Sequence, residues 1–242
     1  MVIIRCNKKK KEECKMTNKE ARILCLIENQ KSCKDICHSL NMKRIEFYEH
    51  IMLLQNKGIN FKRKYFANGN IIYQVLHTPQ EIQENILTNN NKIILEENQK
   101  QLKTLILSDL HIGSTLERPD LISRAFRYCK VNNIHIIFCC GDIIDGPPSK
   151  YTDQKIKGID KQMEYMIETI PIYEDILVFA VGGNHDLHAL KKSGQSLTTL
   201  FNNYRHDIIM NDYGNTNIEI ANDSIQLFHK TRNPRPTENK EA

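Results

Sequence analysis

Three short polar segments directly follow apolar, strand-like runs, and their residue types are those that bind divalent metal ions. They are Asp109-Leu110-His111, Gly141-Asp142-Ile143-Ile144-Asp145 and Gly183-Asn184-His185-Asp186. Carboxylates, imidazoles and amide oxygens are ligands for hard or borderline cations. Their order and spacing indicate two metal ions at the carboxyl ends of neighbouring strands. Such a pair of ions suits hydrolysis of a phosphate ester.

The elements that must position these segments indicate an α/β fold with a parallel sheet. The apolar runs that end at the motifs are 104–107, 134–140 and 176–181. Continuous apolar runs are typical of strands covered on both faces, and ligands gather beyond the carboxyl ends of such strands. Between the runs we expect helices over 120–131 and 152–170. After the third motif we expect a helix over 197–204 and then strands of a second sheet at 208–210, 218–220 and 225–228.

The three motifs in this order resemble those of the calcineurin-like metallophosphoesterases. The resemblance implies a two-sheet αββα sandwich that holds two divalent metal ions, manganese, iron or zinc. Carried over by position, it assigns Asp109 and His111 to the first metal, Asp142 to both, and Asn184 and His229 to the second. A metal-bridging hydroxide would then hydrolyse a phosphodiester or a phosphomonoester.

The other motif residues would serve the reaction without binding metal. The resemblance, which covers about residues 103–230, implies that His185 hydrogen-bonds a phosphate oxygen or protonates the leaving group. It implies that Asp145 and Asp186 orient the metal ligands. A competing interpretation makes the acidic and amide residues helix N-caps and the histidines ordinary surface residues. Three such coincidences in register are unexpected.

The family pattern breaks after His229. The family usually has glycine next, where this chain has Lys230, and then a Gly-His-x-His segment, whereas no histidine follows His229 here. We therefore expect each metal to lack one ligand, and the phosphoesterase domain, 102–242, to be truncated at its C-terminus. We also expect the second sheet to have an unpaired edge and an uncovered apolar face.

The first third of the chain is basic. Residues 1–80 hold 16 Lys and Arg against 7 Asp and Glu, while the remainder holds 18 against 22, and such a division suggests that the first module meets a polyanion. Apolar spacing predicts helices over 18–30, 32–40 and 43–57. Asn68-Gly69 then predicts a hairpin between two strands. This pattern resembles a winged helix-turn-helix domain.

We expect this small winged-helix domain to span 1–80, with a linker at 81–101 that holds one short strand or helix. The resemblance implies that the third helix enters the major groove of DNA and that the hairpin touches the backbone. The side chains expected at DNA, first on the helix and then on the hairpin, are Lys43, Arg44, Tyr48, Lys62, Arg63 and Lys64. Glu46 and Glu49 weaken this interpretation because they repel phosphate. The alternative is a protein-interaction domain with a solvated basic face.

Other sequence features bound the class of protein. No apolar run approaches the ~18 residues of a membrane span, and no signal peptide is evident, so we expect a cytoplasmic protein without a membrane partner. We therefore expect the eight cysteines to be reduced thiols. Cys33 and Cys37 share a helical face, which either zinc binding or core packing requires, but their spacing matches no paired zinc-ligand set.

Together these patterns predict a metal-dependent phosphoesterase whose substrate is a phosphate ester. The basic first domain makes a nuclease the leading specific version. The competing interpretation is a non-enzymatic DNA-binding protein with a degraded phosphoesterase domain, which the missing histidines favour. A third interpretation pairs a protein-binding first domain with an enzyme that acts on a nucleotide or a phosphoprotein.

Overall fold

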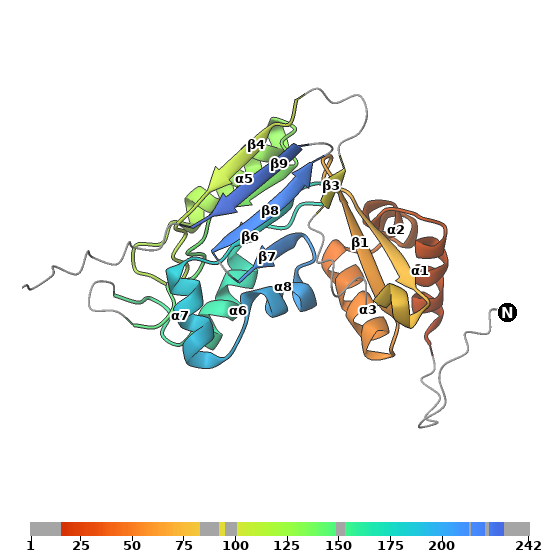
Figure 1. Ribbon diagram of the computed structural model, residues 1–242, viewed down its shortest axis with the longest axis horizontal. Helices are drawn as coiled ribbons and strands as arrows, with labels where there is room; N and C mark the ends of the chain where they lie inside the picture. The colour runs from red at the N-terminus through yellow and green to blue at the C-terminus, as the bar shows by residue number, and fades with distance from the viewer. Residues whose placement is uncertain are drawn as a thin grey trace, which may run out of the picture.

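The protein is built from two β-sheets with helices packed around them (Figure 1). The computed structural model describes residues 16–82, 92–94, 101–148, 153–212, 214–220 and 223–229, with the backbone alone at 92–94. One sheet has four strands, all parallel, and the other has five strands in mixed directions. The fold is therefore mixed α/β, as the sequence predicts.

The four-stranded sheet has the order β4-β5-β6-β7. Its strands are β4 (Thr104–Leu107), β5 (Ile136–Cys139), β6 (Leu177–Val181) and β7 (Ile208–Asn211). Parallel neighbours need a crossover, usually a helix. The crossovers are α5 (Pro119–Val131), α6 (Ile159–Thr169), and the pair α7 (Asn184–Ser193) and α8 (Leu197–Tyr204). The assignment of 208–210 to the second sheet is wrong, because α7 and α8 return the chain to the open edge of β6.

The N-terminal helices follow local sequence signals. They are α1 (Asn18–Glu28), α2 (Cys33–Leu40) and α3 (Arg44–Asn56), close to the predicted ranges. Thr17 and Ser32 cap the first two with complete capping boxes. The thiols of α2 are buried in the core, as the packing interpretation requires. Helix α6 begins later than predicted, directly after Gly158 with its φ of 99°. Among the described helices, none is long and apolar enough to cross a membrane.

The five-stranded sheet joins the two ends of the chain. Its order is β2-β1-β3-β8-β9, from β1 (Asn60–Phe66), β2 (Ile71–Leu76), β3 (Lys92–Ile94), β8 (Asn215–Ile220) and β9 (Asp223–Phe228). The predicted hairpin at Asn68-Gly69 connects β1 and β2 as antiparallel neighbours. Strand β3 lies within the expected linker and pairs in parallel with both β1 and β8. The hairpin is thus an integral part of the second sheet.

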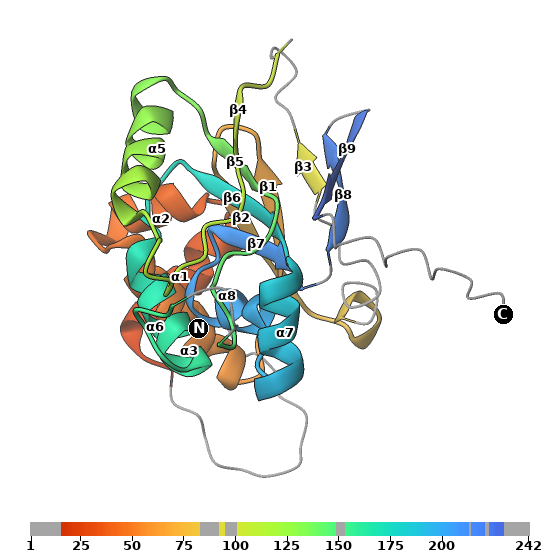
Figure 2. The ribbon, with the colours of Figure 1, turned by 90° about the vertical axis from the view of Figure 1, so that its left-hand side faces the viewer.

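The four-stranded sheet is covered on both faces. One face packs on helices, with Phe126, Met166 and Phe201 in its core. The other face packs on the five-stranded sheet, and Figure 2 shows α5 and α6 on the opposite side of β5 and β6 from β8 and β9. In this second core the rings of Tyr65 and Phe179 meet edge-on, 5.9 Å apart, a contact that stabilises by about 1 kcal/mol beyond the buried area.

The expectation of an uncovered apolar face is therefore wrong for the middle of the sandwich. The N-terminal hairpin supplies the cover, because β1 continues the second sheet through β3. Apolar surface remains where the two edge strands β4 and β9 lie, since Ile106 is 67% exposed and Phe228 is 60% exposed. Among the described residues, β9 is an edge strand of the second sheet, as the predicted unpaired edge requires.

A buried arginine connects the end of α6 to the start of β7 through hydrogen bonds and an ion pair. Arg205 is 0% exposed and forms a two-pronged ion pair with Asp207, with N–O distances of 3.0 and 2.9 Å. The same guanidinium donates to the carbonyl oxygens of Ile167, Ile170 and Pro171. Each charge is therefore compensated, which a buried ion pair requires.

Candidate metal centre

The three polar motifs meet at one edge of the four-stranded sheet. Each forms the segment that leaves β4, β5 or β6, and these strands are neighbours in the sheet. The first two segments are hydrogen-bonded to each other, since the Asp109 N–H donates to the Gly141 carbonyl and the His111 N–H to the Asp142 carbonyl, both at 3.0 Å. Parallel strands end at the same edge, so residues far apart in the sequence are brought together.

The backbone of the site is strained. Asp109, His111 and Asp142 have φ values of 55°, 43° and 52°, in the left-handed region that side chains other than glycine rarely adopt. Each such residue costs on the order of 1 kcal/mol, and such strain clusters at functional sites. The glycines beside them are needed for close packing: a Cβ on Gly141 would lie 2.6 Å from His229 Nδ1, and one on Gly183 would lie 2.0 Å from Asp142 Oδ1.

One group of side chains presents oxygen and nitrogen lone pairs to a common point. His229 Nδ1 lies 2.7 Å from the carbonyl oxygen of Cys140 and must donate to it, which in the neutral ring leaves Nε2 as an acceptor. That Nε2 lies 3.2 Å from Asn184 Oδ1 and 3.5 Å from Asp142 Oδ2. All three atoms are acceptors in this arrangement. Several acceptor atoms that face one another, with no hydrogen-bond donor between them, form an arrangement that suits a bound cation.

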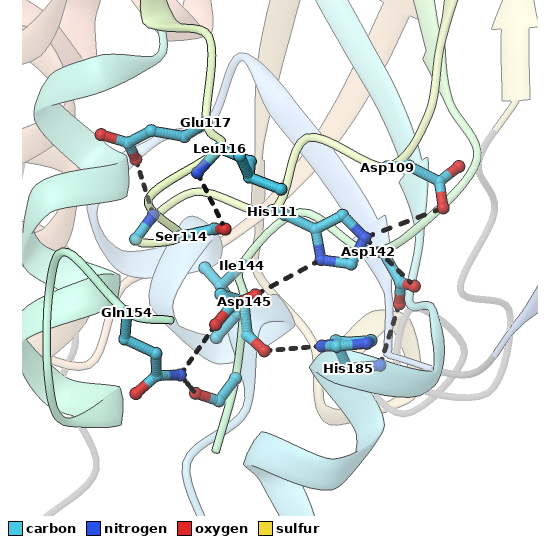
Figure 3. Close-up of polar contacts among 12 residues, drawn as sticks. Asp109, His111, Ser114, Leu116, Glu117, Asp142, Ile144, Asp145, Gln154 and His185 are labelled. Carbon is cyan, nitrogen blue, oxygen red and sulfur yellow. Dashed lines mark hydrogen bonds and ion pairs between the residues drawn. The ribbon is translucent and has the colours of Figure 1, made fainter. Parts of the chain in front are cut away.

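His111 lies among three carboxylates (Figure 3). Its Nε2 is 3.9 Å from Asp109 Oδ1 and 3.9 Å from Asp142 Oδ2, and its Nδ1 is 3.7 Å from Asp145 Oδ1. His111 Nδ1 and Asp145 Oδ1 are both buried without a hydrogen-bond partner among the described residues. A small closure would join these two atoms and direct Nε2 at the other carboxylates, as in a carboxylate–histidine–metal arrangement.

Hydrogen bonds to neighbouring residues orient the ring of His185. Its Nδ1 lies 2.6 Å from the backbone carbonyl oxygen of Asp145 and donates to it, so Nε2 carries the lone pair. Its backbone N–H donates to Asp142 Oδ1 at 2.9 Å, and its ring meets that of His111 edge-on at 4.6 Å. The side chain is half-buried, so the ring is fixed beside the other histidine.

The buried carboxylate of Asp186 organises the loops. It accepts from the backbone N–H groups of Gly183, Ile143 and Ile144, at 2.9 to 3.1 Å. Burial raises the pKa of Asp186, although these donors oppose the rise. Asp186 thereby connects the turn after β5 to the start of α7, which places the two segments that carry Asp142 and Asn184.

Sequence reasoning missed two side chains that support the site. Ser108 donates to the carboxylate of Asp109, and Gln154 Nε2 donates to Asp145 Oδ2 at 2.8 Å. Ser108 directly precedes the first motif, so its position offered a signal. Gln154 lies nine positions after Asp145 in a stretch without periodicity, and only the tertiary fold brings it there.

The donor set fits divalent metal ions. Asp109, Asp142 and His229 each offer a ligand atom, and these atoms lie within 4.8 Å of one another; the same holds for His111, Asp145 and His185. Carboxylate oxygen and imidazole nitrogen suit manganese, iron and zinc.

A family model agrees with this geometry. The model for calcineurin-like phosphoesterases matches residues 102–240. The chain belongs to the calcineurin-like phosphoesterase family. As a member of this family it is placed among metal-dependent hydrolases of phosphate esters, and its parallel sheet with motif-bearing strand ends agrees with the family fold. No curated protein matches the chain in a sequence search.

Two of the side chains expected at DNA, Arg44 and Tyr48, are buried, which corrects the prediction for them, and a third, Arg63, is half-buried. Arg44 is 5% exposed and donates from Nη1 to the Tyr173 carbonyl at 2.8 Å, while Tyr48 is 0% exposed. Arg63 donates from Nη2 to Asn202 Oδ1 at 2.7 Å. Helix α3 packs against α8 of the phosphoesterase half, and Arg63 on β1 reaches α8 through its bond to Asn202.

The other three side chains expected at DNA remain accessible. Lys43 and Lys64 are exposed, and Lys62 is half-buried. Lys62 and Lys64 alternate along β1 with the inward-facing Phe61 and Tyr65, so they lie on the outer face of the hairpin. Any contact of this region with a polyanion would therefore be made by the hairpin surface and by Lys43 at the start of α3.

Proposed function

We propose that this protein is a metal-dependent phosphoesterase whose metal ligands are Asp109, His111, Asp142, Asn184 and His229. The observation that supports this assignment best is the convergence of His229 Nε2, Asn184 Oδ1 and Asp142 Oδ2 as three acceptors. Asp142 is buried in the group with Asp109 and His229, and its Oδ2 lies 3.9 Å from His111 Nε2 of the other group, so its carboxylate could serve both groups.

Bound divalent ions supply positive charge to the phosphate ester and produce a nucleophile from water at neutral pH. The protein contributes orientation and proton control. With Nδ1–H fixed on the Asp145 carbonyl, His185 in its doubly protonated form would give the Nε2 proton to the leaving oxygen or donate a hydrogen bond from Nε2 to a phosphate oxygen. Asp145 would orient His111, and Asp186 would hold the two loops together.

The assay is hydrolysis of bis(p-nitrophenyl) phosphate and p-nitrophenyl phosphate with added manganese. Asp142→Asn should lower activity by more than the about 100-fold loss typical of residues that only orient a ligand. Asp160→Asn, at an exposed carboxylate in the first turn of α6, is the matched control and should keep wild-type activity. Equal turnover by wild type and Asp142→Asn would rule out this site. A folded wild type without turnover would favour the non-enzymatic alternative.

Among phosphoesterases, a nuclease is the specific activity that the basic first third of the chain favours. Lys62 and Lys64 on the outer face of the hairpin support it, whereas the burial of Arg44 and Tyr48 argues against insertion of α3 into a groove. Phosphate contacts make affinity fall steeply with salt. Duplex DNA should bind at low salt and bind more weakly to a Lys62→Gln, Lys64→Gln double variant. Identical salt dependence for both proteins would exclude the hairpin as the DNA contact.

A further inference from the structure

A polar cleft lies between the N-terminal region and the phosphoesterase half, away from the three motifs. It has a volume of about 280 Å³ and opens between α3, β1 and β2 on one side and α8 on the other. Its polar lining is Gln55, Asn60, Arg63, Asn202, Asn203 and His206. Small-molecule sites are concave, are placed preferentially between domains, and carry a few converging polar groups.

Arg63 is the one formal charge in this lining, and it has no counter-ion. Among the described residues, no carboxylate lies within ion-pair distance of its guanidinium. The group makes one side-chain hydrogen bond, to the neutral Asn202. The residue is half-buried, but its Nη1 is removed from solvent and has no hydrogen-bond partner within the described residues. An arginine stays charged at all physiological pH values, and a buried donor atom without an acceptor is costly. An anion in the cleft would remove that cost.

His206 does not supply a second charge. It is 1% exposed, its Nδ1 lies 2.6 Å from the Tyr73 hydroxyl, and its buried Nε2 has no partner in the part of the chain that the structure describes. Burial, with the nearby Arg63, lowers the pKa of His206 to about 3, so the ring is neutral at pH 7. Among the described residues, the lining therefore offers one guanidinium and several amide groups, and no acidic side chain.

We propose that this cleft binds a small molecule that carries a phosphate or carboxylate group, with Arg63 paired to the anionic group. The planar guanidinium fork matches both groups. The amide side chains of Gln55, Asn60 and Asn203 can donate to and accept from a polar body attached to the anion. The occupant would touch β1 and α8 together, so binding would hold the two halves of the chain against each other.

The test is a titration of the full chain with inorganic phosphate, acetate, adenosine 5′-monophosphate and adenosine, followed by thermal unfolding and calorimetry. A chelator is present so that no anion is held through a metal, and the titration is repeated with manganese. We expect saturable stabilisation by at least one of the three anions and none by adenosine. If inorganic phosphate binds more tightly than acetate, the ligand carries a phosphate group. If acetate binds more tightly, the ligand carries a carboxylate group.

Three variants decide whether the cleft is the site. Arg63→Gln removes the guanidinium, and Asn202→Asp gives that guanidinium an internal counter-ion in nearly the same volume. Each should weaken anion binding at least tenfold, and Asn202→Asp decides where Arg63→Gln does not fold. Lys161→Gln removes an exposed charge on α6, outside the lining of the cleft, and should bind as wild type. No saturable binding by wild type, or unchanged affinity in Asn202→Asp, would overturn the proposal.

Discussion

The buried imidazole of His206 should make the stability of this protein fall as the pH is lowered. It is 1% exposed, is hydrogen-bonded to Tyr73, and lies near the cations of Arg63 and Arg44 and the carboxylate of Asp207. Burial is the largest cause of its low pKa, and Arg63 adds to it, so the folded-state pKa is about 3. In the unfolded chain the imidazole regains the ordinary value of about 6.5.

Proton linkage determines the direction in which the free energy of unfolding changes with pH. Between the two pKa values the unfolded chain binds a proton that the folded chain does not, so acid favours unfolding in that window. Each pH unit below about 6.5 costs about 1.4 kcal/mol until the folded-state pKa is reached. From pH 7.5 to pH 5 the loss attributable to His206 is about 2 kcal/mol. The contribution is fully present above pH 6.5 and is lost as the pH falls toward 3.

The assay is urea unfolding at pH 7.5 and pH 5 for wild type and His206→Asn, in chloride buffers without phosphate. The variant loses packing at both pH values, so the quantity that matters is the change between them. We expect the wild-type free energy of unfolding to drop by about 2 kcal/mol more than that of the variant. His188→Asn, at an exposed position on α7, is the control and should follow wild type. Equal drops in wild type and His206→Asn would refute the reasoning.

Two further substitutions test the site and the scaffold. Gly183→Ala would place a Cβ 2.0 Å from Asp142 Oδ1, so it should weaken manganese binding in calorimetry while the far-UV circular dichroism stays native; unchanged affinity would contradict the role given to that carboxylate. Arg205→Met leaves the buried Asp207 without its ion-pair partner, and should lower the free energy of unfolding by about 3–5 kcal/mol in urea. Adding Asp207→Leu should recover most of that loss, and no recovery would place the cost elsewhere.

The sequence by itself determined the local elements and the composition of the site. Each motif follows a short apolar strand, and the strand end, the glycine and the polar residues are contiguous in the chain. Because neighbouring parallel strands end at the same edge, their order was enough to expect Asp109, Asp142 and Asn184 in one place. The capping boxes and the Asn68-Gly69 turn are equally local signals, so α1, α2 and the hairpin could be predicted from a few residues each.

Only the tertiary structure decided what each apolar face packs against. Periodicity shows that Phe61 and Tyr65 face inward, but not that they cover the parallel sheet of the other half. The pairing of β3 with β1 and β8 joins segments more than a hundred residues apart, and nothing local specifies such contacts. That pairing accompanies the packing of α3 against α8, and it places Arg63 in the lining of a cleft between the two halves, bonded to Asn202. A basic residue in the sequence reveals its charge, whereas its surroundings depend on the whole fold.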